Sequence, residues 1–374
     1  MTVLLLIIAL IYVPAIGWLV IGALRLPRFK IFNTQPITKF TIIIPFRNEE
    51  KNLPALLESI DHLDYPVEFF EIILVNDASD DNGEHILQKL AQESKLQLRI
   101  LQNKRISASP KKDAIRTALE QAKHEWIITT DADCELPKNW LRCYDQLIRN
   151  QVPNMVCGPV VYKRNKSLLG HFQFLDGLSL QGVAMGSFGW SQPMLCNGAN
   201  LAYKKSVFEA VEGYKYNDHI ASGDDIFLLE KIHSYYPNTV YYLNSKEAVV
   251  LTKPESNWSQ AIQQRIRWAS KTAKQKNTQS KVLGIIVFLG NLAFIASLFL
   301  FTWDSSPVYL LMIILGIKLA VDLTLLRVAG QLLGKPISFL NFLVNTIIYP
   351  PLTLWVVVNS ISGNYQWKGR NFKK

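Results

Sequence analysis

Polar and acidic side chains that could do chemistry follow three short β-branched runs of the sequence. The segments read Pro45-Phe46-Arg47-Asn48-Glu49, Asn76-Asp77-Ala78-Ser79-Asp80 and Thr130-Asp131-Ala132-Asp133. In an open α/β sheet, ligands bind at the carboxyl ends of the strands. The three segments are therefore the first candidates for a binding site.

Asp131 and Asp133 lie two positions apart after the last of these runs. If the backbone stays extended through residue 133, both side chains point to one side, because a strand repeats every two residues. Two such carboxylates suit Mg²⁺ or Mn²⁺, which takes its other ligands from water and from a substrate's phosphates. The alternative is a solvated turn in which Asp133 caps a following helix.

Phosphate groups would have to be bound without a glycine-rich loop. The sequence contains no G-x-x-x-x-G-K-[ST] motif, and no G-x-G-x-x-G motif follows the first expected strand. A metal ion and isolated basic side chains remain, and Lys111 and Lys112, which follow Pro110, are candidates. The alternative for these lysines is an exposed basic start of a helix.

Asp224 and Asp225 precede an apolar run at residues 226–232. An acidic residue there could be an N-cap, which the helix dipole favours. It could also be a base that deprotonates a hydroxyl group. The stretch by itself leaves both interpretations open.

Gln264, Arg267 and Trp268 are spaced i, i+3 and i+4, so they share one face of a helix. An amide, a guanidinium and an indole on one face could bind a diphosphate and stack on a sugar. The alternative is an interfacial helix whose Trp and Arg anchor at lipid headgroups.

The segments that must position these residues are short β-branched runs, and they alternate along the chain with stretches of helical spacing. We expect strands at residues 40–45, 71–76, 97–101 and 126–130, and helices at residues 49–63, 81–94 and 111–123. This alternation predicts an α/β domain with a parallel sheet. Residues 152–250 are less regular, and we assign them to the acceptor-facing half of the same domain without predicting their secondary structure.

Residues 2–24 carry no charge and are long enough to cross a hydrocarbon core. A cleaved signal peptide would need basic residues before the apolar run. Here Arg25, Arg28 and Lys30 follow it, which places the next segment in the cytosol by the positive-inside rule. With further apolar segments at 282–303, 308–328 and 339–361, we expect a multi-pass protein of the cell membrane, such as a bacterial inner membrane.

Three crossings after a cytosolic Lys281 would leave the C-terminus outside, yet the basic tail favours the inside. Pro350 and Pro351 lie in the middle of the last segment, so we predict a broken, re-entrant or interfacial helix there. The alternative is a kinked but complete crossing. The expected domains are residues 1–24, 38–275, 282–361 and a basic tail at 362–374.

The formal net charge of +10 could indicate nucleic acid, but the basic residues gather near membrane ends rather than in one block with aromatics. We therefore expect anionic membrane lipids as partners and no nucleic acid. The four cysteines show no C-x-x-C spacing, which predicts reduced thiols rather than a zinc site or a redox pair.

Taken in order, the motifs resemble the membrane-bound, processive-type members of glycosyltransferase family two. That group includes cellulose and N-acetylglucosamine polymer synthases and, more distantly, ceramide glucosyltransferases. The resemblance runs from about Phe40 to Trp268 and rests on five segments: Ile44-Pro45-Phe46-Arg47-Asn48-Glu49, Val75-Asn76-Asp77-Ala78-Ser79, Asp131-Ala132-Asp133, Gly223-Asp224-Asp225 and Gln264-Arg265-Ile266-Arg267-Trp268.

The resemblance implies a Rossmann-like GT-A fold, a nucleotide-sugar donor such as a UDP-sugar, and inversion at the anomeric carbon. Asp77 would bind the nucleotide base, Asp131 and Asp133 the diphosphate with Mg²⁺ or Mn²⁺, and Asp225 would be the catalytic base. Further donor-binding residues would be Pro45, Arg47, Glu49, Lys111, Lys112, Gln264, Arg267 and Trp268. The acceptor, a lipid or glycan hydroxyl, would meet Asn197, Gly198 and Asp224.

Two departures from the family pattern affect these expectations. Gly223-Asp224-Asp225 stands where Glu-Asp is more usual, which favours Asp225 as the base. The membrane region is short for a polymer exporter, which leaves processivity open. A nucleotidyltransferase and a catalytically dead membrane scaffold are the rival classes, but the first gives the Gln-x-x-Arg-Trp segment no role and the second does not account for the acidic motifs.

Overall fold

The computed structural model describes residues 2–32, 34–94, 96–272, 274–303, 308–362, 365–368 and 370–372. These residues divide into two compact units. The α/β unit comprises Pro27–Lys163 and Leu195–Lys253, and the helical unit comprises Met1–Leu26, Arg164–Met194 and Pro254–Lys374.

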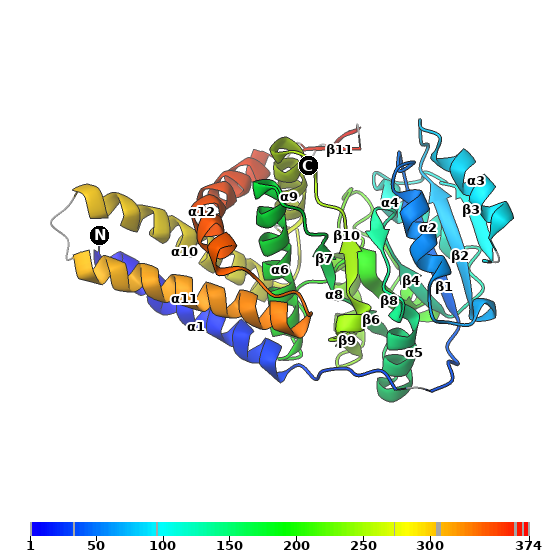
Figure 1. The fold of residues 1–374 in the computed structure, drawn as a ribbon, viewed down its shortest axis with the longest axis horizontal. Helices are drawn as coiled ribbons and strands as arrows, with labels where there is room; N and C mark the ends of the chain where they lie inside the picture. Colours follow the sequence, from blue (N-terminus) through cyan, green and yellow to red (C-terminus); the bar gives the residue numbers. More distant parts are fainter. Residues whose placement is uncertain are drawn as a thin grey trace. The chain divides into compact units, whose positions relative to one another are not determined.

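The α/β unit is built on a seven-stranded sheet in the order β3-β2-β1-β4-β8-β6-β9 (Figure 1). Its strands are β1 (Phe40–Phe46), β2 (Phe70–Asn76), β3 (Leu98–Gln102), β4 (Trp126–Thr129), β6 (Met155–Cys157), β8 (Leu201–Lys204) and β9 (Val240–Tyr242). The first four strands are parallel, whereas β8 runs antiparallel to β4 and β6. Ile42, Ile43 and Ile44 are each 0% exposed, so β1 is buried on both faces, as crossover helices require.

The register brings the carboxyl ends of the first strands to one edge. Phe46 of β1 pairs with Asn76 of β2, which in turn pairs with Gln102 of β3. The helices of this unit are α2 (Leu53–Asp61), α3 (Gly83–Glu93), α4 (Pro110–Leu119), α5 (Trp140–Gln151), α7 (Lys205–Ala210) and α8 (Ile226–Tyr235). A second sheet joins β5 (Cys134–Glu135), β10 (Val250–Thr252) and β7 (Val160–Tyr162).

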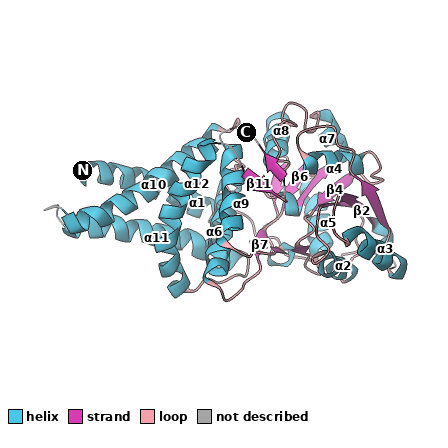
Figure 2. Ribbon diagram, turned by 90° about the horizontal axis from the view of Figure 1, so that it is seen from above, coloured by secondary structure: helices cyan, strands magenta, loops and turns pink. Residues whose placement is uncertain are grey.

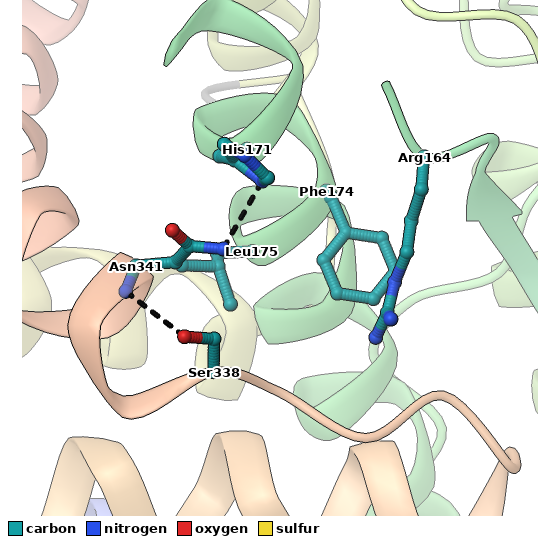
Figure 3. Close-up of a pocket in the computed structure, with 6 residues that line it drawn as sticks. All are labelled: Arg164, His171, Phe174, Leu175, Ser338 and Asn341. Carbon is teal, nitrogen blue, oxygen red and sulfur yellow. Dashed lines mark hydrogen bonds between the residues drawn. The ribbon is translucent and has the colours of Figure 1, made fainter. Parts of the chain in front are cut away.

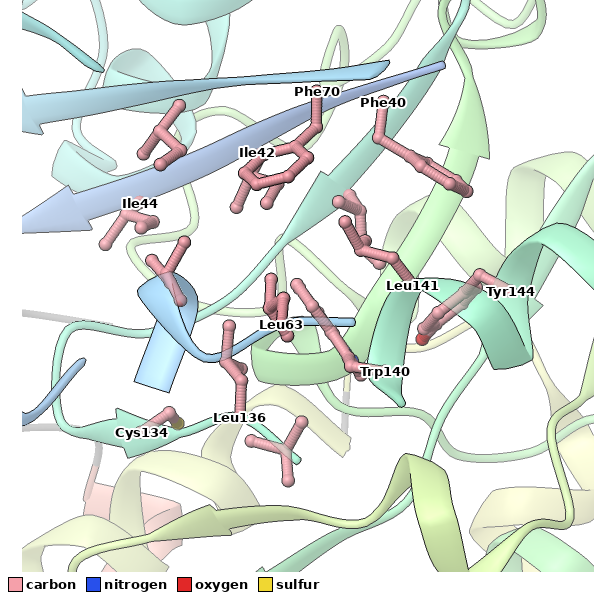
Figure 4. Packing of buried hydrophobic residues seen from close by; sticks show 14 of the residues in the cluster. Phe40, Ile42, Ile44, Leu63, Phe70, Cys134, Leu136, Trp140, Leu141 and Tyr144 are labelled. Carbon is pink, nitrogen blue, oxygen red and sulfur yellow. The ribbon is translucent and has the colours of Figure 1, made fainter. Parts of the chain in front are cut away.

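One large apolar cluster holds this unit together. Figure 4 shows Phe40, Ile42 and Ile44, alternate residues of β1, in the same cluster as Trp140 and Tyr144 of α5. The two aromatic rings of α5 meet edge to face at 5.9 Å. The core therefore fixes the position of β1, whose carboxyl end forms part of the edge where the candidate residues lie.

The helical unit contains α1 (Thr2–Arg25), α6 (Leu168–Phe188), α9 (Trp258–Thr272), α10 (Thr278–Trp303), α11 (Val308–Leu332) and α12 (Phe339–Ser362). Figure 2 labels these helices and β11 (Tyr365–Trp367), which forms a hairpin with β12 (Arg370–Phe372). Among the described residues, α1, α10, α11 and α12 are long and apolar enough to cross a membrane. The chain thus has the elements of a multi-pass membrane protein.

Helices α1 and α6 pack through their backbones at glycines. A Cβ at Gly22 would overlap the carbonyl oxygen of Gly186, and a Cβ at Gly186 would lie 2.5 Å from the carbonyl oxygen of Leu19. In a lipid environment, burial of apolar side chains gives no net driving force for helix association, and small residues favour it by allowing helices to approach this closely. The indole of Trp190 then donates to the Trp18 carbonyl at 2.8 Å.

The expected strands and apolar helices are confirmed within a few residues, with two differences. Pro350 and Pro351 do not break the last helix, because α12 is continuous across them, so the predicted interruption is wrong. A proline ring fixes φ near the helical value, so the helix continues at the cost of the two missing N–H donors. Residues 164–194 and 254–275, expected within the 38–275 domain, group instead with the apolar helices. Lys373 and Lys374 of the expected basic tail lie outside the described residues.

Candidate active site

Arg47 lies just beyond the end of β1 and holds the segment that follows β2. Its Nη1 donates to the carbonyl oxygens of Asp77, at 2.8 Å, and of Ala78, and its Nη2 pairs with Asp80 at 2.9 Å. Asn48 and Ala78 both adopt φ of 54°, which places each in the left-handed region that non-glycine residues rarely adopt. The predicted donor-binding role of Arg47 stays a prediction, and its described contacts position the loop that carries Asp77.

Asp77 is buried at the same edge, 5% exposed. Its Oδ1 accepts a hydrogen bond from Asn103 at 2.6 Å and lies 3.7 Å from a nitrogen of Arg105. Glu49, also buried, accepts from Asn52 at 2.5 Å. Both carboxylates are thus held by neighbours that belong to the loops after the strands.

Asp113 of α4 organises the loop after β3 and was not singled out from the sequence. Its Oδ2 accepts from the N–H groups of Ile106 and Ser107 at 3.1 and 2.9 Å, and its Oδ1 accepts from the Ser107 hydroxyl at 2.7 Å. The side chain is fully buried and also pairs with Arg105 at 3.3 Å. A single acidic residue inside a helix gives no sequence signal for such a role.

Lys111 brings together the acids that follow β4 and precede α8. Its ammonium lies 2.6 Å from Asp131 Oδ1 and 3.3 Å from Asp224 Oδ2. Burial alone would lower the pKa of Lys111, but Asp131, Asp224 and Asp225 outweigh it and raise the pKa above its ordinary value. Residues far apart in the sequence therefore form one charged cluster, which we call the Lys111 cluster (Lys111, Asp131, Asp224).

Gly198 approaches this cluster so closely that no side chain fits. A Cβ there would lie 2.7 Å from Asp224 Oδ2 and 3.2 Å from Lys111 Nζ. The hydroxyl of Thr129, the last residue of β4, donates to the Gly198 carbonyl at 2.6 Å. Asn197 accepts from the Ala199 N–H at 2.9 Å and so closes the short turn around the glycine.

Asp225 is fixed by two backbone groups from different elements. Its Oδ2 accepts from the Gly198 N–H at 3.2 Å, and its Oδ1 accepts from the Ile226 N–H at 2.7 Å. Asp225 is also the N-cap of α8, which puts its negative charge where a helix favours it. The prediction that an acidic residue caps this helix is thus confirmed. The geometry is also compatible with a chemical role for the Asp225 carboxylate.

Asp131 and Asp133 do not lie on an extended strand. Strand β4 ends at Thr129, and a turn closes where the Cys134 N–H donates to the Asp131 carbonyl at 3.2 Å. The argument from strand alternation is therefore wrong, because the chain turns before Asp133. Asp131 pairs with Lys111, whereas Oδ1 of Asp133 lies 3.7 Å from the Cys134 sulfur.

Lys112 points away from the Lys111 cluster. It is fully buried, and its ammonium donates to the carbonyl oxygens of Asn217 at 2.6 Å and Ile220 at 2.9 Å. The Ser109 hydroxyl donates to the Ala221 carbonyl at 3.1 Å. The donor-binding role of Lys112 stays a prediction, and its described contacts hold residues 217–221, just before Asp224.

Asn200 is a structural hub beneath the Gly198 turn. Its Oδ1 accepts from Trp140 at 2.8 Å and Tyr144 at 2.7 Å, and its Nδ2 donates to the carbonyls of Pro159 at 2.8 Å and Ala248 at 2.9 Å. All four hydrogen-bonding positions of this buried amide, two acceptors and two donors, are thereby satisfied. The turn that carries Asn197 and Gly198 is consequently tied to the core.

Gln264, Arg267 and Trp268 lie on α9 in the helical unit. Gln264 donates to Glu255 at 3.0 Å. The intervening Arg265, not predicted as functional, is buried and pairs with Asp176 of α6 at 2.6 Å. The shared helix face is as expected, and the donor-binding roles stay predictions.

Comparisons with known proteins agree with this architecture. Residues 41–211 match the family described as Glycosyl transferase family 2. The Bacillus subtilis protein named Probable glycosyltransferase YdaM is 25% identical over 63% of this chain and 56% of its own length. A poly-beta-1,6-N-acetyl-D-glucosamine synthase of Staphylococcus epidermidis is 24% identical over 63% of this chain and 55% of its own length. The chain thus spans about half the length of these relatives.

A solved mannosyltransferase of Pyrobaculum calidifontis, in complex with GDP-Man and Mn²⁺, has a similar fold. The TM-score is 0.57 at 16% identity, over 96% of this chain and 98% of that one. At this identity the likeness concerns the fold alone. Together with the sheet order and the family match, it shows that the chain carries a glycosyltransferase family 2 domain with a GT-A fold.

Proposed function

We propose that the protein is an inverting glycosyltransferase that moves a sugar from a nucleotide-sugar donor, a UDP-sugar in the first instance, to a hydroxyl of a lipid or glycan at the membrane. The observation that carries the proposal is the carboxylate of Asp225, fixed by the Gly198 and Ile226 N–H groups. In the neighbouring Lys111 cluster, the Lys111 ammonium, which now pairs with Asp131 and Asp224, is the positive group that would face a diphosphate. The four apolar helices support a membrane setting.

In the proposed reaction, Asp225 accepts the proton of the acceptor hydroxyl while the hydroxyl oxygen bonds to the anomeric carbon. The bond from that carbon to the diphosphate oxygen breaks on the opposite face, so the configuration inverts and nucleoside diphosphate leaves. A fixed carboxylate suits a general base, because it is already held in one orientation. The ammonium of Lys111 would offset the negative charge that grows on the leaving group.

The acidic side chains near the end of β4 are the residues that would hold a divalent cation. Asp131 is a hard oxygen ligand, 38% exposed, and already pairs with a cationic group. Within the described ranges, no group of three or more His, Cys, Asp or Glu could hold a metal ion. Mg²⁺ is often bound by one or two carboxylates together with substrate phosphates. Asp131 and Asp133 would hold the ion, which when bound supplies positive charge for the diphosphate.

The full-length protein in detergent or nanodiscs provides the test. It would be incubated with UDP- and GDP-sugars and a membrane lipid extract, and release of nucleoside diphosphate and glycosylated product would be measured. We expect one donor class to turn over and the Asp225→Asn variant to be inactive. Turnover that Asp225→Asn leaves intact would contradict the proposed base, and absence of any sugar transfer with a complete donor panel would contradict the proposed activity.

A further inference from the structure

Side chains of α9 contact one face of α6 within the helical unit. Phe172 of α6 and Ala261 of α9 belong to one buried apolar cluster, and the rings of Phe172 and Trp258 lie 5.4 Å apart. Helix α9 carries Gln264 and Trp268, two of the predicted donor-binding residues. Helix α6 is therefore one of the supports that fix where these two side chains lie.

Gln173 of α6 holds the chain just before α9. Its side chain is fully buried, its Nε2 donates to the Glu255 carbonyl at 3.0 Å, and its Oε1 accepts from the Glu255 N–H at 2.8 Å. The carboxylate of Glu255 in turn accepts from Gln264 Nε2 at 3.0 Å. A single buried amide thus fixes the backbone of the residue whose side chain orients Gln264.

Asp176 lies three residues after Gln173, so the two share one face of α6. The buried carboxylate of Asp176 forms an ion pair with the buried guanidinium of Arg265, on α9, at 2.6 Å. That guanidinium lies 4.9 Å from the centre of the Phe172 ring and 5.9 Å from that of the Trp268 ring. Rotation of α9 about its axis would therefore break a buried ion pair, which is costly when one charge is left without its partner.

A different face of α6 makes the contacts with α12. Figure 3 shows His171 hydrogen-bonded to Asn341 of α12, at 3.1 Å, and Phe174 and Leu175 lining a small cavity next to them. This hydrogen bond involves no residue of α9. The polar contacts of α6 with α12 and with α9 can therefore be removed separately.

We infer that Gln173 and Asp176 are positioning residues for the donor-binding side chains of α9. Gln173 acts on Gln264 through Glu255, and Asp176 acts through Arg265. Groups that bind a substrate have to be held within about 0.5 Å of the productive geometry by neighbours that are themselves fixed. The inference rests on the proposed function, because it takes α9 as a helix that binds the nucleotide-sugar donor.

Two variants of the full-length protein in detergent test this inference. Gln173→Leu removes the amide that holds Glu255. The double variant Asp176→Leu with Arg265→Met replaces the buried ion pair by apolar side chains, a change that often preserves stability. In both we expect the donor KM to rise about tenfold, because the donor-binding groups are misplaced, while the acceptor KM and the Tm stay near the native values. Hydrogen exchange in residues 255–268 should become faster.

Asn341→Leu is the matched control, because it removes the hydrogen bond of α6 with α12 and leaves the contacts with α9 in place. Its donor KM and its exchange in residues 255–268 should equal those of the native protein. Native exchange in this segment of both test variants would overturn the positioning, and so would a native donor KM. Faster exchange together with no sugar transfer by the native protein would instead support the positioning of α9 and contradict the proposed reaction.

Discussion

At the scale of single residues, the carboxylate of Asp225 is the group that the proposed chemistry depends on most. Asp225→Asn keeps the size of the side chain and removes its basicity. We expect kcat to fall by about 10²-fold or more, with donor affinity nearly unchanged, measured by nucleoside diphosphate release and donor calorimetry. Asp61→Asn, an exposed acid at the end of α2, should behave as the native protein. Loss of donor binding in Asp225→Asn would show that its role is wider than that of a base.

A separate prediction concerns Gly198, because its backbone rather than a side chain lies against the Lys111 cluster. In Gly198→Ala the new Cβ would lie 2.7 Å from Asp224 Oδ2, so the ion pair or the turn must shift. We expect a marked loss of kcat/KM in an otherwise folded protein. Gly316→Ala is a suitable control, since a Cβ there meets nothing within 4 Å. Native activity in Gly198→Ala would mean that the turn can move without consequence.

The metal proposal concerns Asp133 in particular. Excess chelator should abolish transfer by the native protein, and Asp133→Asn should be inactive at any concentration of Mg²⁺ or Mn²⁺. The nearby Glu135→Gln, which removes an acid that pairs with Lys163 at the surface, should remain active. Full activity of Asp133→Asn in excess chelator would contradict a metal at this site.

The sequence predicted which acids follow the strands, but not how they are arranged. The positions of Asp77 and Asp131 follow from strand ends, which short-range patterning reveals. The pairing of Asp131 with Lys111, the close approach of Gly198 and the buried bonds of Asp113 and Asn200 depend on tertiary contacts. Such contacts leave no periodic trace in the sequence.

At the scale of elements, Lys112 ties the first turn of α4 to the segment before Asp224. Lys112→Met would leave the buried carbonyls of Asn217 and Ile220 without this donor, at a cost of about 1–3 kcal/mol. We expect a lower Tm and faster hydrogen exchange in residues 213–223. Lys104→Met, which removes an exposed pair with Glu120, should change neither. Unchanged exchange in residues 213–223 would contradict the positioning role.

Helix α6 was not predicted from the sequence, whereas β1, β2 and α1 were, and the difference has a physical reason. Strands β1 and β2 are β-branched runs bounded by polar residues, and α1 is a long uncharged run, so both patterns are clear. Helix α6 is buried on most of its sides and contains four glycines in its 21 residues. A helix without a polar face lacks the 3.6-residue contrast that identifies amphipathic helices, and glycine is typical of loops.

At the scale of the whole chain, the contacts of α12 bear on the position of the C-terminus. Helix α12 begins just after α11 ends, and Figure 1 shows it running across the direction shared by α1 and α11. It packs against α9, and β11, which follows it, also packs against α9. Because α9 immediately precedes α10, the chain after α12 returns to the side on which α10 begins. If α12 lies in the membrane interface, an unbroken helix would give the same parity that we predicted from a broken one.

A cysteine placed after Lys374 should therefore resist an impermeant thiol reagent added to intact cells and react after permeabilisation. The four native cysteines are buried, and burial raises the pKa of Cys143 to about 12. A raised pKa keeps this thiol protonated until the pH approaches that value, so it stays unreactive near pH 8. The native protein without the added cysteine is the control, and labelling of the variant from outside would contradict the cytosolic assignment.

The interleaving of the two units has a consequence for synthesis on the ribosome. Strand β8 completes the sheet between β4 and β6, yet it is translated only after α6. Until then, β4 presents an unpaired edge of the kind that invites association with other chains. Helix α6 packs against α11, where Gly182 contacts Leu325. Because α11 is synthesised more than a hundred residues later, α6 lacks this partner during that time. We therefore expect the nascent chain to expose an apolar helix and an open sheet edge at the same time, and to contact the insertion machinery or a chaperone early.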